Sequence, residues 1–341
     1  GLFAQLAAGL AQWRAARAIT RRMRAVVLDA PARTPDAAAL DAIALDGWLA
    51  GTIRHPVARA RIAMHAELVF AADPAGLSLL GYLARLAATG GFSPPGPDLP
   101  GGGRDHRFVG GAHALARRLA DALGDRVQVA APVTQVAADG TVRGPDSTIV
   151  ARHVVLAVPP PLAVAIAPDL PPAVRALGAA TRGGGVVKCF AAYPEPFWRA
   201  AGLSGEAYRP RGTVRAVVDA TPPDRDQPIL LAFIVGAEAA AWHARPAADR
   251  RAEVLATLAQ LFGAPALAPL AYLEADWAAD PWSAGCVAST PPGALAPGAV
   301  WRGAHGRLHL AGTEAAVRWP GYMEGAIEAG DNAARAILDA G

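Results

Sequence analysis

Residues 153–158, with the sequence His-Val-Val-Leu-Ala-Val, form a nearly continuous apolar run that stops at Pro159, Pro160 and Pro161. A strand with one solvated face alternates apolar and polar residues, whereas an unbroken apolar run is typical of a strand buried on both faces of a parallel sheet. Purely parallel sheets occur almost only in α/β proteins. The run therefore favours an α/β fold.

The rest of the chain divides into a helical opening and a mixed remainder. Helical periodicity over 2–28, 36–50, 56–71 and 75–89 predicts a helical block, and the Gly/Pro-rich stretch 93–103 predicts a loop between domains. Further helices are predicted at 112–123, 247–262 and 322–340, and strands at 127–130, 133–136, 148–150, 153–158, 184–193, 213–219, 228–235, 270–277 and 307–311. Because the strands of two sheets alternate along the chain, we expect two domains that the chain crosses more than once.

Composition narrows the class of protein. Of the 341 residues, 53% are hydrophobic and 18% charged, which is too apolar for a disordered chain. The formal charge is only +3 and no long run of like charge occurs, so we expect no nucleic-acid partner. The apolar stretches 153–167 and 229–242 are short or broken by proline. We therefore expect a soluble, cytoplasmic protein with no membrane partner.

The cysteines of this sequence indicate neither a metal site nor a set of disulfide bonds. Cys189 and Cys286 are the only two, and they form neither a disulfide framework nor a Cys/His cluster of zinc-binding spacing. We expect no metal.

Lys188 is the only lysine among 32 basic residues. This bias, together with the many alanines, glycines and prolines, resembles the composition of a bacterial protein. Lysine is a compact amine whose pKa shifts readily, whereas arginine stays charged. Lys188 therefore either survives by chance at the surface or lies where arginine would not serve, and composition alone leaves both open.

The segment 308–330 has the strongest functional pattern. It reads as a strand, a polar loop and a helix that begins beside Gly321. Helix N-termini carry unpaired N–H groups and a partial positive charge, and glycine lets a ligand approach the backbone closely. The segment is either an anion or cofactor site or an ordinary connection between a strand and a helix.

This segment closely resembles the C-terminal flavin-binding signature of the flavin-containing amine oxidases, particularly the monoamine oxidases. Other segments resemble the same family in the same order, namely 104–111, 132–133, 153–161, 185–190, 196–199, 203–205, Trp277 and 283–286. The resemblance covers most of 104–341 and, more weakly, 1–100. It implies a two-domain α/β fold in which 1–103 and 163–277 belong to a substrate domain with a mixed sheet and helices. Residues 104–162 and 278–341 would belong to an incomplete, Rossmann-like FAD-binding domain.

The resemblance also implies an activity and a set of site residues. FAD would oxidise an amine with O2, giving an imine or aldehyde, ammonia and hydrogen peroxide. Lys188 matches the lysine that holds a water against flavin N5 and assists the reaction with oxygen. Tyr322 matches one wall of an aromatic pair that guides the amine, and Trp277 matches a tryptophan beside the flavin. The second wall is a tyrosine in the family, but Val287 stands there in this chain.

Further residues are expected to hold the cofactor. Cys286 matches the position of covalent flavin attachment in monoamine oxidases, although we favour non-covalent FAD. Val133 would lie beside the adenine. The C-terminal signature adds Gly312, Thr313, Glu314, Gly321 and Met323. Arg104 lies in a loop that borders the family's substrate pocket, where it would either clamp a substrate carboxylate or stay an exposed loop arginine.

One part of the family pattern is absent from this sequence. No GxGxxG loop of the kind that holds the FAD pyrophosphate occurs, and the glycine runs 101–103 and 183–185 have the wrong spacing. The unit could lie on a separate chain, have been removed, or never have existed in a flavin-free binding or partner subunit. A relative that oxidises an amino acid or a biosynthetic intermediate also stays open, as does a homodimer.

Overall fold

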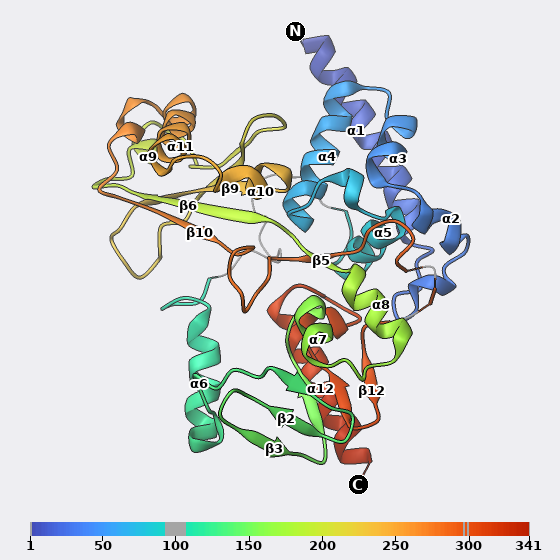
Figure 1. Cartoon of the computed structure of the whole chain (residues 1–341). Helices are drawn as coiled ribbons and strands as arrows, with labels where there is room; N and C mark the ends of the chain where they lie inside the picture. The colour runs from blue at the N-terminus through green and yellow to red at the C-terminus, as the bar shows by residue number, and fades with distance from the viewer. Residues whose placement is uncertain (1, 93–106, 296, 299, 341) are drawn as a thin grey trace.

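The computed structural model describes residues 2–92, 107–295, 297–298 and 300–340. In Figure 1, a helical block and a five-stranded sheet lie above a third region that holds the C-terminal helix. The arrangement is an α/β fold with helices and mixed sheets, as the sequence predicted. Within the described residues, no helix is both long and apolar enough to cross a membrane.

The helical block consists of α1 (Leu2–Met23), α2 (Ala37–Ala42), α3 (Leu45–Thr52), α4 (Pro56–Phe70) and α5 (Leu79–Ala88), with short 3-10 turns at Pro31–Arg33 and Pro74–Gly76. The single helix predicted over 36–50 is wrong, because the chain is extended between α2 and α3. There the Leu79 N–H donates to the Ile43 carbonyl at 2.9 Å, and the Leu45 N–H donates to the Leu77 carbonyl at 2.9 Å. These partners from a distant segment replace the helical hydrogen bonds.

The five-stranded sheet is antiparallel throughout, in the order β10-β6-β9-β8-β7. Its strands are β6 (Val186–Ala192), β7 (Ala207–Tyr208), β8 (Val214–Asp219), β9 (Ile229–Val235) and β10 (Ala271–Asp276), and the helices α9 (Phe197–Ala200), α10 (Ala237–Trp242) and α11 (Ala247–Phe262) follow the same stretch of chain, with a 3-10 turn at Ala264–Leu267. The strands predicted at 184–193, 213–219, 228–235 and 270–277 are confirmed within two residues.

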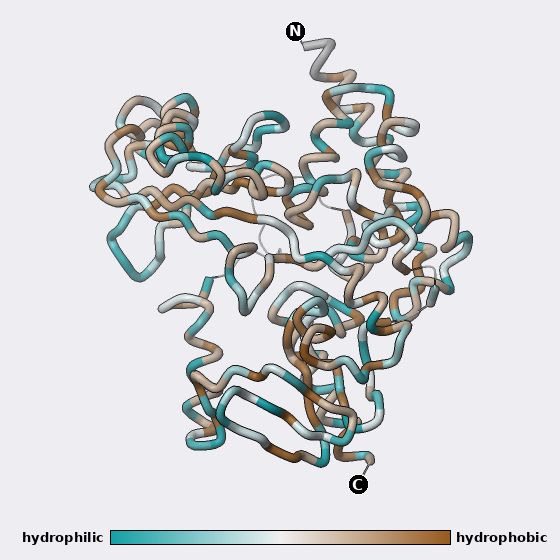
Figure 2. The backbone as a smooth tube through the Cα atoms, viewed as in Figure 1, coloured by the Kyte–Doolittle hydropathy of each residue, from teal (hydrophilic) through white to brown (hydrophobic). Residues whose placement is uncertain are grey.

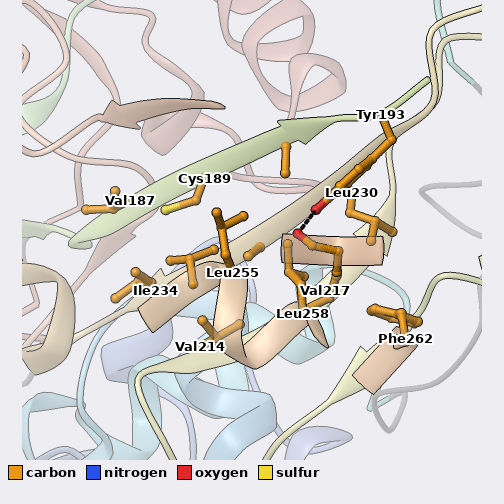
Figure 3. Packing of buried hydrophobic residues seen from close by; sticks show 14 of the residues in the cluster. Val187, Cys189, Tyr193, Val214, Val217, Leu230, Ile234, Leu255, Leu258 and Phe262 are labelled. Carbon is orange, nitrogen blue, oxygen red and sulfur yellow. Dashed lines mark hydrogen bonds between the residues drawn. The ribbon is translucent and has the colours of Figure 1, made fainter. Parts of the chain in front are cut away.

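One face of this sheet packs on α10 and α11. Val187 and Cys189 of β6 are buried in this core with Leu255 and Leu258 of α11 (Figure 3). The Tyr193 hydroxyl donates to the Ala266 carbonyl at 2.9 Å, which satisfies a buried polar group. Burial raises the pKa of the Cys189 thiol to about 12, so this cysteine is an inert core residue, as expected.

The third region contains the parallel strand pair that the apolar run predicted. Strand β4 (Val154–Leu156) pairs in parallel with β13 (Leu308–Leu310), and β12 (Gly303–His305) follows in the sheet order β12-β13-β4. The helices α7 (Pro160–Ile166), α8 (Pro172–Ala180) and α12 (Met323–Asp339) also belong here. The prediction that β4 is buried on both faces is wrong, because Val155 is 44% exposed. Strand β4 is the edge strand of its sheet, so Val155 has a neighbouring strand on one side only.

Beside this pair lie α6 (His113–Leu123), a 3-10 turn at Gly124–Arg126 and a small antiparallel sheet of β1 (Gln135–Val136), β2 (Thr141–Arg143) and β3 (Thr148–Val150). Helix α6 has no buried residue. Figure 2 shows hydrophobic colour along β3 at the lower rim of the molecule. The strand predicted at 127–130 is wrong, because these residues pair with no strand among the described residues. The next strand begins at Gln135, directly after Thr134, whose N–H donates to the Arg143 carbonyl at 2.8 Å.

Candidate active site

Lys188 projects from the face of the five-stranded sheet that lies opposite the α11 core. Side chains alternate along a strand, and its neighbours Val187 and Cys189 are buried in that core. Its register partner on β9 is Phe233, whose ring centroid is 5.9 Å from Lys188 Nζ, and the Trp277 ring is 5.7 Å away. Lys188 forms no ion pair with a described carboxylate. Two aromatic faces therefore hold a free ammonium group in place.

Trp277 begins the loop that carries Cys286. The Trp277 N–H donates to the Val186 carbonyl at 3.2 Å, and the Trp277 carbonyl accepts the Gly285 N–H at 2.9 Å. The Cys286 N–H then donates to the Gly184 carbonyl at 2.9 Å. The loop therefore places the exposed Cys286 thiol near the strand that carries Lys188.

Two glycines before β6 allow the Cys286 loop and the end of α4 to pack closely against the chain at 183–184. A Cβ on Gly183 would lie 2.1 Å from the Ala284 carbonyl oxygen, and a Cβ on Gly184 would lie 2.0 Å from that of Phe70. No other residue has space there, because α4, the strand β5 (Arg182–Gly183) and the Cys286 loop meet backbone to backbone. The Gly184 N–H donates to the Val287 carbonyl at 2.9 Å, so Val287 lies at this crossing, just before β11 (Ala288–Ser289).

The C-terminal signature folds into a tight loop between β13 and α12. After Gly312 comes a 3-10 turn at Thr313–Ala315. The Thr313 hydroxyl donates to the Tyr322 carbonyl at 2.8 Å and accepts the Gly321 N–H at 2.7 Å. Gly321 has φ +77°, a left-handed conformation that favours glycine. These bonds set where α12 begins.

The first turn of α12 is open to solvent. Tyr322, at the N-cap, is 39% exposed and Met323 is 47% exposed, and no side chain caps the helix. The N–H groups of the first turn therefore lack side-chain acceptors, and the helix dipole adds a partial positive charge. Met323 also lines an open groove of about 1000 Å³ with Arg107, Gly110 and the loop 222–225. An electron-rich carbonyl or anion placed there would be stabilised.

Sequence reasoning missed Arg85, which the fold brings to Tyr322. The Arg85 side chain donates from Nη1 to the Pro320 carbonyl, and its Cζ lies 5.2 Å from the Tyr322 ring centroid. The Trp319 ring also packs against Tyr322, edge to face, with 5.3 Å between the two ring centroids. Arg85 is the only charged residue in the apolar run 77–88 and comes three residues after Tyr82. A charged residue at a position where the helical pattern predicts a buried apolar one could have identified Arg85 as a candidate.

The remaining predicted residues have different positions. Gly312 is buried, and a Cβ there would lie 3.2 Å from the Val158 carbonyl oxygen and 3.1 Å from Glu314 Oε2. Burial raises the pKa of the Glu314 carboxyl. Val133 precedes β1 in the region of α6 and is 39% exposed. Arg104 lies outside the described residues.

Known proteins resemble this chain over most of its length. Residues 2–338 match the family model described as flavin containing amine oxidoreductase. The chain is 31% identical to the flavin-containing amine oxidase A of the horse, Equus caballus, over 332 residues, which are 92% of this chain and 61% of the horse protein. The chain therefore spans less than two thirds of that relative's length.

Solved structures are similar over nearly the whole chain. The cyclohexylamine oxidase from Brevibacterium oxydans IH-35A superposes with a TM-score of 0.89 at 32% identity, covering 96% of this chain and 74% of that one. A wild-type putrescine oxidase bound to putrescine superposes with a TM-score of 0.88 at 28% identity, covering 97% of this chain and 76% of that one. These matches extend across all three regions of the fold.

Proposed function

Since this chain belongs to the flavin-containing amine oxidoreductase family, we propose that it is an FAD-dependent amine oxidase or the large fragment or subunit of one. A primary or secondary amine, O2 and water would give an aldehyde, ammonia or an amine, and hydrogen peroxide, by way of an imine. The observation that carries the proposal is the free ammonium of Lys188, held between Phe233 and Trp277 next to the Cys286 loop.

The residues present fit the ring end of a flavin. The exposed rings of Trp277 and Tyr322 suit a flat aromatic group, and the uncapped start of α12 suits its carbonyl oxygens. Gly321 has no side chain, and a Cβ there would lie 2.5 Å from Arg85 Nη1, so the glycine lets Arg85 pack directly against this loop. Trp277, Cys286, Gly312, Thr313, Glu314, Gly321, Tyr322 and Met323 are the residues that would hold this end, and Val133 is proposed for the adenine. When bound, FAD supplies the two-electron acceptor for the amine and passes those electrons to oxygen.

Lys188 is proposed to act in the reaction with oxygen. Its ammonium is a compact charge with three donors, and no described carboxylate neutralises it. It would hold a water molecule and stabilise the negative charge that develops as oxygen is reduced. Arginine, with its planar fork, would present the donors in a different geometry, which explains why a lysine persists here.

The wall that faces the amine is half aromatic. Tyr322, braced by Trp319 and Arg85, offers its ring to the N–H edge of an amine. Val287 offers only a small apolar surface where the family has a second tyrosine. We therefore propose a substrate bulkier or less symmetric than one held between two aromatic rings. Arg104 stays a proposed substrate residue.

A dinucleotide-binding unit would complete the site, and a separate chain could supply it. The free edge of β4 and the uncovered helix α6 support this, because both expose apolar side chains beside the parallel strand pair. Val155 is 44% exposed, Leu119 59% and Leu123 51%. Large exposed apolar patches commonly mark interaction sites. Such a unit would add a strand to β4 and bring the residues for the pyrophosphate.

Absorbance and peroxide release test this proposal. The native assembly, or the chain reconstituted with FAD, should show flavin absorption and form peroxide when amines are added. Lys188→Met should keep the flavin and its reduction by amine, but slow reoxidation by oxygen about 100-fold, the usual scale for the loss of one transition-state donor. Lys188→Arg serves as the charge-matched control. A colourless assembly that takes up no FAD contradicts the proposal, and normal reoxidation in Lys188→Met contradicts the role of this lysine.

A further inference from the structure

Asp41, near the end of α2, carries a carboxylate that is fully buried. It is 0% exposed, and so is Ser78, the residue just before α5. Burying a charged group is costly unless hydrogen bonds satisfy it. The Ser78 hydroxyl donates to Asp41 Oδ1 at 2.5 Å, and the Leu295 N–H donates to Asp41 Oδ2 at 2.8 Å. The two carboxylate oxygens therefore hold two segments that lie far apart in the sequence.

The first of these segments is α5, and its start is fixed by Ser78. The hydroxyl oxygen of Ser78 accepts an N–H of the first helical turn at 3.2 Å, while its hydrogen goes to the carboxylate. Further along the same helix, the Arg85 guanidinium lies 5.2 Å from the Tyr322 ring. At the end of the helix, the Ala88 carbonyl accepts the Trp319 N–H at 3.0 Å. The position of α5 therefore sets the position of the Tyr322 loop.

The second segment, 290–295, continues the chain from Val287 through β11. The Ser78 N–H donates to the Thr290 carbonyl at 3.0 Å, and the Gly293 N–H donates to the backbone carbonyl of the buried aspartate at 3.0 Å. With the bond to the carboxylate, three hydrogen bonds fasten this segment to the end of α2 and the start of α5. The place of Val287 therefore depends on the same junction.

We propose that Asp41 is a positioning residue that sets the separation of the two walls of the amine site, Tyr322 and Val287. It acts through the two segments rather than on the reacting atoms. A carboxylate suits this place because both partners are donors and each of its oxygens accepts one of them. The amide of asparagine has one acceptor oxygen, so one of the two donors would lose its partner. The assignment of the two walls rests on the proposed oxidase function.

Hydrogen exchange of the full chain tests this junction without turnover. In Asp41→Asn, amide exchange should rise about 10-fold in segments 288–295 and 319–322, the scale for the loss of one buried hydrogen bond, and stay unchanged in β6 and β9. Asp46→Asn, the same change at an exposed residue of α3, is the matched control and should alter neither segment. A uniform rise in every segment, which a merely structural role predicts, overturns the proposal, as does unchanged exchange at 319–322.

Half-reaction kinetics of the FAD-loaded chain separate positioning from chemistry. In Asp41→Asn the amine should bind about 10-fold more weakly, measured from the concentration dependence of flavin reduction, while reoxidation by oxygen keeps its rate because Lys188 lies on the sheet. Slower reoxidation with unchanged amine binding overturns the proposal.

A second variant keeps the proposal falsifiable if Asp41→Asn does not fold. Ser78→Ala removes one bond and leaves the Leu295 N–H on the carboxylate, so it should weaken amine binding about 3-fold. Unchanged amine binding in Ser78→Ala overturns the inference and leaves the oxidase proposal intact. A chain that takes up no FAD but shows the expected exchange contradicts the oxidase proposal and supports the coupling of the two segments.

Discussion

Gly325, in the first turn of α12, is required by space rather than by backbone conformation. A Cβ at this position would lie 2.2 Å from the Trp319 carbonyl oxygen and 3.0 Å from Thr313 Oγ1. Trp319 has φ +53°, and its N–H donates to the Ala88 carbonyl at 3.0 Å, so it cannot move away freely. The loop that carries Tyr322 is therefore packed directly on the helix backbone.

Gly325→Ala should reduce the free energy of unfolding by about 2 kcal/mol, because the added methyl group overpacks the loop. Gly330→Ala is the matched control on the same helix, since a Cβ there meets nothing within 4 Å. It should raise stability by about 0.5 kcal/mol through its better helix propensity. Denaturant unfolding of both variants measures this difference. Equal stability of the two would show that the loop yields easily.

At the scale of elements, Asp219 ties the end of β8 to α9. It accepts hydrogen bonds from Trp198 Nε1 and Arg199 Nε, both at 2.8 Å, and from the Thr221 N–H at 3.0 Å. Burial alone would raise the pKa of its carboxyl, but these hydrogen bonds outweigh burial and hold the pKa below its usual value. The ionised carboxylate therefore joins the end of β8 to α9 and to the turn that follows the strand.

Because this pKa is lowered in the folded state, the stability that Asp219 contributes is present above the unfolded value of about 4 and is lost as the pH falls through the folded value. Asp219→Asn should reduce the free energy of unfolding at neutral pH by about 2 kcal/mol, since it removes acceptors for charged donors. It should also make the loss of stability below pH 4 shallower. Urea unfolding across pH measures both. Asp331→Asn, at a side chain 63% exposed, should change neither, and an unchanged acid slope in Asp219→Asn would contradict this account.

At the scale of the whole molecule, the five-stranded sheet and the helical block each bury a core, whereas α6 buries none of its residues. An amphipathic helix gains most of its stability from packing, and in the described part of the chain α6 contributes no buried side chain to a core. On the edge strand β4, Val155 is likewise 44% exposed. Both features lie on the surface where we propose that a dinucleotide-binding unit docks.

Leu119→Arg should leave the stability of the chain itself unchanged, because Leu119 is 59% exposed on α6. In the native assembly it should lower the flavin content about 10-fold, since burying a charge in place of a leucine removes more than about 1.4 kcal/mol of association energy. Flavin absorbance per chain is the measurement. Leu338→Arg, at a leucine 78% exposed near the end of α12, should keep its flavin. Full flavin content in Leu119→Arg would rule out this surface as the interface.

The sequence by itself determined the elements and the identity of the family. Local sequence patterns located β6, β8, β9 and β10 within two residues, and the motif around 308–330 identified Tyr322 and the start of α12. Local patterns succeed here because a strand or helix start depends on neighbouring residues. The break between α2 and α3, the missing strand at 127–130 and the exposed face of Val155 depend on which distant segment supplies hydrogen bonds or cover. Arg85 and Pro320, 235 residues apart, meet only in the tertiary structure. Only packing therefore decided that Arg85 lies against the Tyr322 loop, because no local pattern encodes a contact between segments so far apart in the sequence.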